Sequence, residues 1–237
     1  MLSATDIEVR FGGLTAVSGV SLNAPRNKIL SIIGPNGAGK TTLFAVLSGF
    51  LVPTRGTVTL DTQRLDGMPA HAVARNGIAR TFQIVRPFPD MTVLDNVIVG
   101  AYARTSSYRE ASAVSARVLE KVGLFPKRAF LAAHLTLRDL KLLEVAEALA
   151  TQPKLLLLDE VMAGLNIKEQ HDVASMLEGI HAGGTGILLV EHSLAIVHRM
   201  SDHVICLDSG RKIAEGTASA VLESKQVQAA YMGIDDD

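Results

Sequence analysis

The sequence has little that would place the protein across a membrane, in an oxidising compartment or on nucleic acid. Its 237 residues contain one cysteine, Cys206, which has no internal disulfide partner and is expected to be a small buried apolar residue. The longest apolar runs, residues 155–158 and 187–190, fall far short of the roughly 20 residues of a membrane span. The formal net charge is −1, so the composition does not favour sequence-independent binding to nucleic acid.

Other familiar signals are also missing. The first ten residues carry Asp6, Glu8 and Arg10 without an apolar run behind a basic start, so we expect no secretory signal. The seven histidines show no spacing typical of metal ligands. Any link to a membrane is therefore expected to come through a partner.

Short apolar runs alternate with helical patterns along most of the chain. Strand-like runs occupy residues 7–11, 29–33, 56–61, 154–158, 186–190 and 203–207, with a weaker candidate at 17–22. Apolar residues at helical spacing follow residue 40 and separate the later strands, while residues 87–149 favour a mostly helical insert. Strands that alternate with helices predict an α/β fold with a largely parallel sheet.

A glycine-rich segment at residues 34–42 follows a predicted strand and opens a predicted helix. Its glycines allow backbone N–H groups to converge on phosphate oxygens, and the positive end of the helix faces the same anion. Lys40 is expected to reach the β- and γ-phosphates, and the Thr41 hydroxyl to ligate Mg²⁺. The predicted ATP-binding residues are Gly34, Pro35, Asn36, Gly37, Ala38, Gly39, Lys40, Thr41 and Thr42.

Two adjacent acids follow the apolar run at residues 154–158. Beside a phosphate loop, Asp159 can hold Mg²⁺ through water, and Glu160 can deprotonate the attacking water. Two solvated acids at the exit of a buried strand are the alternative, and the phosphate loop upstream favours the catalytic interpretation.

Over residues 7–233 the sequence resembles the ATP-binding subunits of ABC transporters. The phrases that resemble the importers of branched-chain and hydrophobic amino acids are Phe11-Gly12-Gly13-Leu14, Arg80-Thr81-Phe82-Gln83, Phe88-Pro89-Asp90-Met91-Thr92-Val93, Ala163-Gly164-Leu165-Asn166 and Val190-Glu191-His192. The resemblance implies a P-loop NTPase core with a mainly parallel sheet, an antiparallel β part near the N-terminus and a helical subdomain. It implies one domain over residues 1–237, with the core at about 1–86 and 150–237 and the subdomain at about 87–149.

The resemblance also assigns roles to single positions. Phe11 looks like the aromatic residue that stacks on adenine, although a phenylalanine at a strand end is more often part of a core. Gln83 looks like the glutamine that contacts Mg²⁺, and His192 looks like the catalytic switch histidine that touches the γ-phosphate. Residues 164–166 resemble a loop that crosses a dimer interface.

The partners implied by the resemblance form a membrane assembly. Family members bind two ATP molecules between two head-to-tail nucleotide-binding subunits, which are identical or different chains. Residues 85–95 are expected to dock on two transmembrane permease subunits, with a periplasmic substrate-binding protein as an indirect partner. The protein is then expected to lie peripherally on the cytoplasmic face of the inner membrane, and no nucleic acid is expected.

The function implied is ATP hydrolysis that energises import of a small solute, with branched-chain or other hydrophobic amino acids as the default. Related systems import amides, urea or aromatic acids. A non-transport ABC ATPase acting on DNA or ribosomes is a further alternative, although such proteins typically carry a coiled coil or a duplicated domain. A small-molecule kinase with a phosphate loop would lack the phrases around Gln83 and His192.

One segment departs from the family pattern. The signature motif that meets the partner's ATP usually reads Leu-Ser-Gly-Gly-Gln, but residues 135–139 here read Leu-Thr-Leu-Arg-Asp. Thr136 keeps a hydroxyl for the γ-phosphate, Leu137 and Arg138 replace the glycines, and Arg138 could offset the charge of Asp139. Thr136 and Asp139 also resemble a capping box that starts a helix. A weakened phosphate contact and an alternative working signature both stay open, and the departure predicts unequal ATP sites in a heterodimer.

Overall fold

The computed structural model describes residues 1–83 and 86–232 of the 237-residue chain. Val85, at the start of the expected docking segment, and residues 235–237 of the acidic tail lie outside this part. No helix among the described residues combines the length and apolar character that crossing a bilayer requires.

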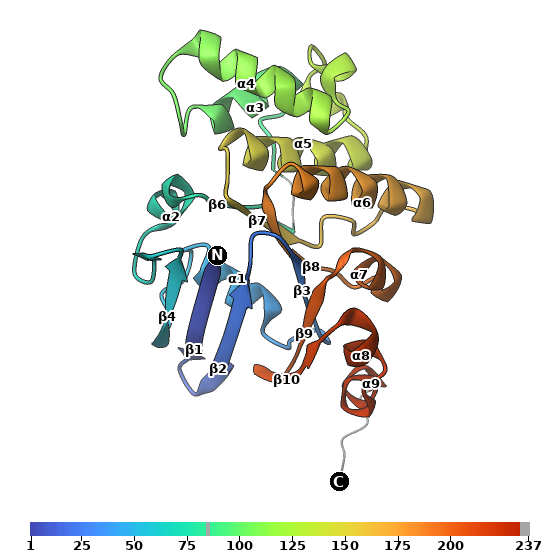
Figure 1. Ribbon diagram of the computed structural model, residues 1–237. Helices are drawn as coiled ribbons and strands as arrows, with labels where there is room; N and C mark the ends of the chain where they lie inside the picture. Colours follow the sequence, from blue (N-terminus) through green and yellow to red (C-terminus); the bar gives the residue numbers. More distant parts are fainter. Residues whose placement is uncertain (84–85, 233–237) are drawn as a thin grey trace.

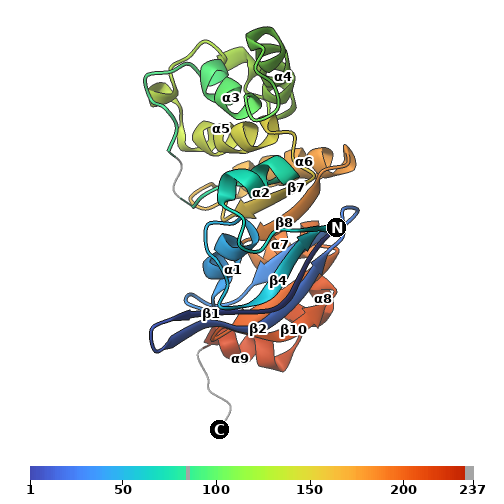
Figure 2. The ribbon, with the colours of Figure 1, turned by 90° about the vertical axis from the view of Figure 1, so that its left-hand side faces the viewer.

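A small antiparallel sheet is built from the N-terminal part of the chain. Its strand order is β2-β1-β4-β5, and each neighbouring pair runs antiparallel. The strands are β1 (Leu2–Phe11), β2 (Leu14–Ala24), β4 (Arg55–Leu60) and β5 (Gln63–Arg64). Figure 2 shows this sheet in blue and cyan in the lower half of the view. The expected antiparallel part near the N-terminus is therefore confirmed.

A larger, mainly parallel sheet forms the centre of the molecule. Its order is β10-β9-β3-β8-β7-β6, and only β10 runs antiparallel to its neighbour. The strands are β3 (Ile29–Ile33), β6 (Ile78–Arg80), β7 (Leu155–Asp159), β8 (Gly186–Val190), β9 (His203–Asp208) and β10 (Arg211–Gly216). Every residue of β3, β7 and β8 is buried, because layers cover both faces of these central strands.

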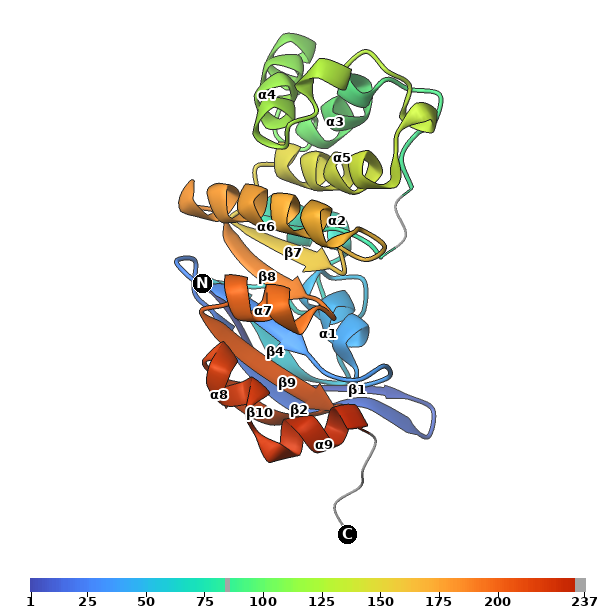
Figure 3. The ribbon, with the colours of Figure 1, turned by 90° about the vertical axis from the view of Figure 1, so that its right-hand side faces the viewer.

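The helices lie on both sides of this sheet and at one end of the molecule. Their bounds are α1 (Lys40–Leu47), α2 (Ala70–Asn76), α3 (Val93–Ala101), α4 (Tyr108–Lys121), α5 (Leu137–Ala150), α6 (Ile167–Ala182), α7 (Leu194–Met200), α8 (Ala218–Leu222) and α9 (Lys225–Met232). Two short 3-10 turns, η1 (Phe125–Lys127) and η2 (Ala132–His134), precede α5. Helices α3, α4 and α5 form the group at the top of Figure 1, and Figure 3 shows the same arrangement from the side.

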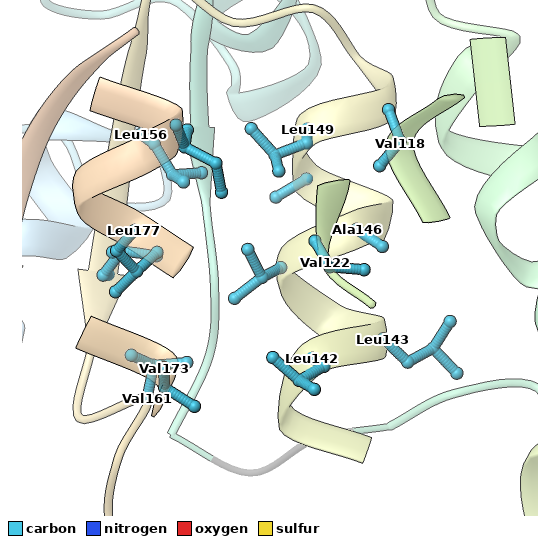
Figure 4. Packing of buried hydrophobic residues seen from close by; sticks show 14 of the residues in the cluster. Val118, Val122, Leu142, Leu143, Ala146, Leu149, Leu156, Val161, Val173 and Leu177 are labelled. Carbon is cyan, nitrogen blue, oxygen red and sulfur yellow. The ribbon is translucent and has the colours of Figure 1, made fainter. Parts of the chain in front are cut away.

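Two large apolar cores flank the larger sheet, and a smaller third one packs β3 and β9 against α7, α8 and α9. On one face, residues of β7 and β8 pack against α5 and α6, and this core continues into α3 and α4. Figure 4 shows Leu142 and Leu149 of α5 between Val118 of α4 on one side and Leu156 and Leu177 on the other. On the opposite face, α1 is packed between the larger sheet and the antiparallel one. The helices α3, α4 and α5 lie in the segment expected to be mostly helical, residues 87–149. Their apolar residues form the part of the first core that lies farthest from the sheet.

The structure contains strands that the sequence pattern did not reveal. Strand β1 begins at Leu2 rather than at residue 7, because Asp6 has a φ of 51° and the register shifts between Ala4 and Ile7, which interrupts the alternation. Strand β6 has only three residues, too few for a periodic pattern. Strand β10 is an edge strand with mostly exposed polar residues, so it lacks an apolar pattern.

Candidate functional site

The phosphate loop lies between β3 and α1, where close backbone approaches require glycine. Gly34 has a φ of 144°, and an added Cβ would lie 2.0 Å from the carbonyl oxygen of Leu207 in β9. Gly39, the N-cap of α1, has a φ of 95°, and its Cβ would lie 2.5 Å from the carbonyl oxygen of Ala16 in β2. Any larger residue would force one of these backbones to move.

The Lys40 side chain is buried and folded over this loop. Its Nζ donates hydrogen bonds to the carbonyl oxygens of Gly34 at 2.7 Å and Pro35 at 2.9 Å. Burial lowers the pKa of Lys40, and the carboxylates of Glu160 and Asp159 act in the opposite direction. The ammonium group therefore lies beside the N-terminus of α1, which is itself favourable for an anion.

The C-terminal helix α9 contacts the phosphate loop through Tyr231. The N–H of Gly34 donates a hydrogen bond of 2.9 Å to the Tyr231 hydroxyl, although the two residues lie at opposite ends of the chain. Burial raises the pKa of this hydroxyl. The sequence analysis missed the contact, because no local pattern indicates which loop a short terminal helix will meet.

Tyr231→Phe is expected to lower the free energy of unfolding by about 1 kcal/mol, because the buried N–H of Gly34 loses its acceptor. Denaturant unfolding of the isolated chain measures this change. Tyr108→Phe is the matched control, since Tyr108 is 61% exposed at the start of α4. Equal stability of Tyr231→Phe and the wild type would contradict the role of this hydrogen bond.

A cavity of about 630 Å³ lies over the phosphate loop. Phe11, at the end of β1, lines it and is 52% exposed, so its ring is accessible for the expected stacking on adenine. Leu14, the first residue of β2, and Ser209 and Gly210, in the turn between β9 and β10, line it as well and were not predicted, because only the fold brings them to the loop. The complete lining is Phe11, Leu14, Thr15, Ala16, Asn36, Gly37, Ala38, Gly39, Lys40, Thr41, Thr42, Gln83, Glu160, Ser209 and Gly210.

Three predicted site residues meet at the edge of this cavity. Glu160 Oε2 accepts a hydrogen bond from Gln83 Nε2 at 2.9 Å, and His192 Nε2 lies 2.7 Å from Glu160 Oε1. They follow β6, β7 and β8, which are neighbouring parallel strands whose carboxyl ends open on one edge of the sheet. Both oxygens of the Glu160 carboxylate are therefore oriented by neighbouring side chains at the cavity.

The backbone at Glu160 is held in a conformation that costs energy. Its φ of 52° lies in the left-handed region, where a residue with a side chain costs about 1–2 kcal/mol. The Glu160 N–H donates to the carbonyl oxygen of Val190 at 2.9 Å, and Glu191 Oε1 accepts from the Met162 N–H at 2.9 Å. Hydrogen bonds from the end of β8 thus hold the turn that aims Glu160 at the cavity.

The residues expected to hold magnesium line a second cavity of about 560 Å³ beside the first: Thr41, Gln83 and Asp159. Asp159 is almost completely buried, and its Oδ1 has no hydrogen-bond partner among the described residues. A carboxylate, a hydroxyl and an amide supply the hard oxygen donors that Mg²⁺ prefers. Residues 1–83 and 86–232 contain no cluster of three His, Cys, Asp or Glu that could hold a metal.

Arg80 forms an ion pair with Asp159 that the sequence did not predict. Its Nη2 lies 2.9 Å from Asp159 Oδ2, and its guanidinium lies over the rings of Phe44, Phe50 and Phe82 at 5.8, 6.0 and 5.4 Å. Burial raises the pKa of Asp159, and the neighbouring Arg80 opposes that rise. The ion pair therefore offsets part of the cost of burying this carboxylate beside the phosphate loop.

The altered signature segment forms the start of α5. Thr136 is the N-cap, and its hydroxyl accepts from the Asp139 N–H at 3.3 Å and donates to Asp139 Oδ2 at 2.8 Å. Asp139 is buried and forms an ion pair with Lys127. The expectation that Arg138 offsets the charge of Asp139 is therefore wrong, because the carboxylate points inward to Lys127.

Leu137 and Arg138, which replace the signature glycines, are more exposed than Asp139. Leu137 is 49% exposed, and an added Cβ on Gly164 would lie 3.0 Å from Leu137 Cδ2. Arg138 Nη2 is 3.8 Å from Asp172 Oδ2, which is too long for a hydrogen bond. Leu137 is thus next to the segment expected to cross a dimer interface.

Three glutamates near the site are held in surroundings that disfavour their charge. Burial raises the pKa of Glu144, Glu147 and Glu191 from 4.5 to about 7. In the unfolded chain these groups ionise near pH 4.5, so between that value and about pH 7 the folded chain binds more protons. The contribution of these groups to stability is therefore present at the lower pH and is lost as the pH rises.

We expect the free energy of unfolding to fall as the pH rises from about 5 to about 7, because the unfolded state loses these protons first. Urea unfolding at several pH values measures the slope. Glu191→Gln removes one of the three groups and should make the slope shallower. A stability that is constant or rises over this range would contradict the prediction.

Comparison with known proteins identifies the family. The model of the ABC transporter family matches residues 17–163. The chain is 37% identical to the high-affinity branched-chain amino acid transport ATP-binding protein BraF of Pseudomonas aeruginosa, over 98% of both chains. It is 39% identical to the corresponding protein LivG of Escherichia coli, again over 98% of both chains.

Solved structures agree with this result. An ATP-binding cassette of an ABC transporter in its ADP conformation superposes with a TM-score of 0.90 at 31% identity, covering 98% of both chains. A nucleotide-free ATP-binding cassette from an ABC transporter gives a TM-score of 0.89 at 30% identity and the same coverage. The chain therefore belongs to the ABC transporter family, as an ATP-binding and ATP-hydrolysing subunit.

Proposed function

We propose that this chain hydrolyses ATP to drive the import of branched-chain or other hydrophobic amino acids. The observation that carries the proposal is the carboxylate of Glu160, held between Gln83 and His192 at the phosphate loop. The relatives named for branched-chain amino acid transport support the substrate class, because they align with nearly the whole chain.

The nucleotide is proposed to occupy the cavity over the phosphate loop. Phe11 stacks on the adenine, and the backbone N–H groups of residues 34–42 surround the phosphates. Lys40 turns from the carbonyl oxygens of Gly34 and Pro35 to the β- and γ-phosphates, which are stronger acceptors because they are charged.

Magnesium is proposed to be held by Thr41, Asp159 and Gln83, which line one cavity. When bound, Mg²⁺ supplies positive charge beside the β- and γ-phosphates. Arg80 forms its ion pair with Asp159 Oδ2, so Asp159 Oδ1 is left to act as the magnesium ligand.

For hydrolysis, Glu160 acts as the general base that takes a proton from the attacking water. Gln83 and His192 orient its two oxygens, and His192 contacts the γ-phosphate. Both contacts with Glu160 hold its carboxylate at the edge of the cavity.

The working assembly is proposed to contain a second nucleotide-binding subunit and two transmembrane permease subunits, supplied by a periplasmic substrate-binding protein. A solved bacterial ABC transporter cassette of the same fold is a dimer, which supports the proposal of a second nucleotide-binding subunit. The described part of the docking segment, residues 86–95, leads into α3. The chain would then lie on the cytoplasmic face of the inner membrane.

Unequal ATP sites are proposed for a heterodimer. The Thr136 hydroxyl is engaged with Asp139, and Leu137 occupies the surface where the family has glycine. This segment would serve the partner's ATP, whereas Glu160 acts on the ATP of this chain. Glu160→Gln should therefore reduce the ATPase rate of the complex more than the equivalent change in the partner. Equal losses would contradict the asymmetry.

The import function is tested by purification from native membranes. We expect the tagged chain to copurify with two multi-span membrane subunits. The associated substrate-binding protein should gain thermal stability with leucine, isoleucine or valine, but not with urea or amides. Association with ribosomes or DNA in place of membrane subunits would overturn the proposal, and stabilisation by urea or amides alone would overturn its substrate class.

A further inference from the structure

A buried lysine contacts two of the residues assigned to ATP hydrolysis. Lys141, in the second turn of α5, is only 4% exposed, although its ammonium group needs hydrogen-bond acceptors. Its Nζ donates to the carbonyl oxygen of Gln83 at 3.3 Å and to that of Glu160 at 3.5 Å. None of the steps proposed for ATP hydrolysis uses this side chain.

The two carbonyl groups belong to the residues whose side chains meet at the nucleotide cavity. Gln83 Nε2 donates to Glu160 Oε2 at 2.9 Å, and both residues line that cavity. Their side chains are therefore joined directly, and their backbones are joined through Lys141. The hydrogen bonds of Lys141 are at the long end of the usual range, so each one is weak by itself. Their effect lies in joining two segments that are far apart in the sequence.

The backbone of Glu160 is held on both sides of its strained residue. The Glu160 N–H donates to the carbonyl oxygen of Val190 at 2.9 Å, and the Glu160 carbonyl oxygen accepts from the Ala163 N–H at 3.1 Å and from Lys141. A residue with a φ of 52° keeps that conformation only where its surroundings impose it. Lys141 is thus one of the contacts that set the direction of the Glu160 side chain.

The segment that follows β6 is attached to α5 at two points. Glu144 lies three residues after Lys141 and therefore on the same face of α5, and its Oε1 accepts a hydrogen bond from the Phe82 N–H. Lys141 donates to the next residue, Gln83. Strand β6 has only three residues and Gln83 is exposed, so few other contacts fix the position of this segment.

Lys141 also lies near the end of the third strand of the site. Burial raises the pKa of Glu191, the residue before His192, and the charge of Lys141 opposes that rise. Glu191 in turn accepts a hydrogen bond from the Met162 N–H at 2.9 Å. One ammonium group is therefore close to the residues that follow β6, β7 and β8.

We propose that Lys141 is a positioning residue for ATP hydrolysis. Its ammonium group holds the backbones of Gln83 and Glu160 at the separation at which Gln83 orients the Glu160 carboxylate. This inference rests on the proposed function, in which Glu160 is the general base. Lys141 does not line the nucleotide cavity, so it contributes to the rate of hydrolysis and not to the binding of ATP.

The test is Lys141→Met in the assembled transporter, because methionine keeps an unbranched stem and lacks the ammonium group. We expect kcat for ATP hydrolysis to fall about 10- to 100-fold, the size of effect that a small displacement of a catalytic group produces. The KM for ATP should change by less than about twofold, because binding does not use Lys141. Lys121→Met, in the exposed last turn of α4, is the matched control and should change neither constant.

Two further variants separate positioning from general support of the fold. Lys141→Arg keeps a positively charged donor and should recover most of the lost rate. Adding Lys141→Met to Glu160→Gln should lower the residual rate by less than about twofold, since the effects of residues that act as a unit are not additive. The melting temperature of each isolated chain is measured alongside.

Several results would overturn this proposal. They are a kcat of Lys141→Met equal to that of the control, a loss fully additive with that of Glu160→Gln, and a Lys141→Arg variant no faster than Lys141→Met. A Lys141→Met chain that does not fold would mean that the lysine supports the whole fold, which would overturn it as well. Unchanged hydrolysis in Glu160→Gln would overturn the proposed function itself, whereas a large loss there with none in Lys141→Met would overturn only this inference.

Discussion

Glu160→Gln is expected to reduce ATP hydrolysis by the assembled transporter about 10²- to 10⁴-fold, the usual contribution of a general base. The amide of glutamine cannot accept the proton of the attacking water at neutral pH. It can still accept the hydrogen bond from Gln83 and occupy the same turn, so the geometry of the site should be preserved. Phosphate release under saturating ATP measures the loss.

ATP binding should be unaffected by this change, because Glu160 lies at the edge of the cavity and not in the phosphate loop. Fluorescent ATP analogues give the dissociation constant for the isolated chain. Glu223→Gln, at the exposed end of α8, is the matched control and should alter neither measurement. A Glu160→Gln variant that hydrolyses ATP at the rate of the control would remove Glu160 from the mechanism.

Lys40→Ala is expected to weaken ATP binding by the isolated chain about 100-fold or more, since a hydrogen bond to a charged group contributes about 1.5–3 kcal/mol and Lys40 reaches two phosphates. The buried side chain also bonds the carbonyl oxygens of Gly34 and Pro35, so the loop itself should become less ordered. Equilibrium titration with an ATP analogue measures the effect.

Two controls separate this loss from general damage. Lys168→Ala removes an exposed lysine near the start of α6 and should bind ATP normally. Arg138→Gly alters the signature segment, which is outside the nucleotide cavity of this chain, and should also bind normally. Loss of binding after Arg138→Gly would contradict the assignment of that segment to the partner's ATP.

The sequence predicted the parts of the site that follow buried strands. Gly34 comes after β3, Glu160 after β7 and His192 after β8, and each of these strands is short, mostly apolar and fully buried. Because the carboxyl ends of parallel strands lie at the same edge of a sheet, the residues that follow them converge there regardless of the length of the loops between the strands. The positions of these central strands and the convergence of Gly34, Glu160 and His192 were therefore predictable from the sequence pattern, whereas Gln83 follows the three-residue strand β6 and was expected only from the family resemblance.

Contacts between segments without a local pattern could not be predicted from the sequence. The hydrogen bond from Gly34 to Tyr231, the ion pair of Arg80 with Asp159, and that of Lys127 with Asp139 each join residues whose own surroundings in the sequence are unremarkable. Such pairs depend on how the layers pack. Asp139 is an example. The sequence suggested that its charge would be offset by the neighbouring Arg138, but its buried carboxylate pairs with Lys127.

The most direct test of the central claim is ATP-driven uptake of leucine by proteoliposomes that contain this chain, its nucleotide-binding partner and the permease pair, with the substrate-binding protein added. We predict uptake that requires ATP on the side to which this chain is bound. With Glu160→Gln, uptake and hydrolysis should fall together while ATP binding persists. Leucine uptake that continues in Glu160→Gln at the wild-type rate would contradict the account.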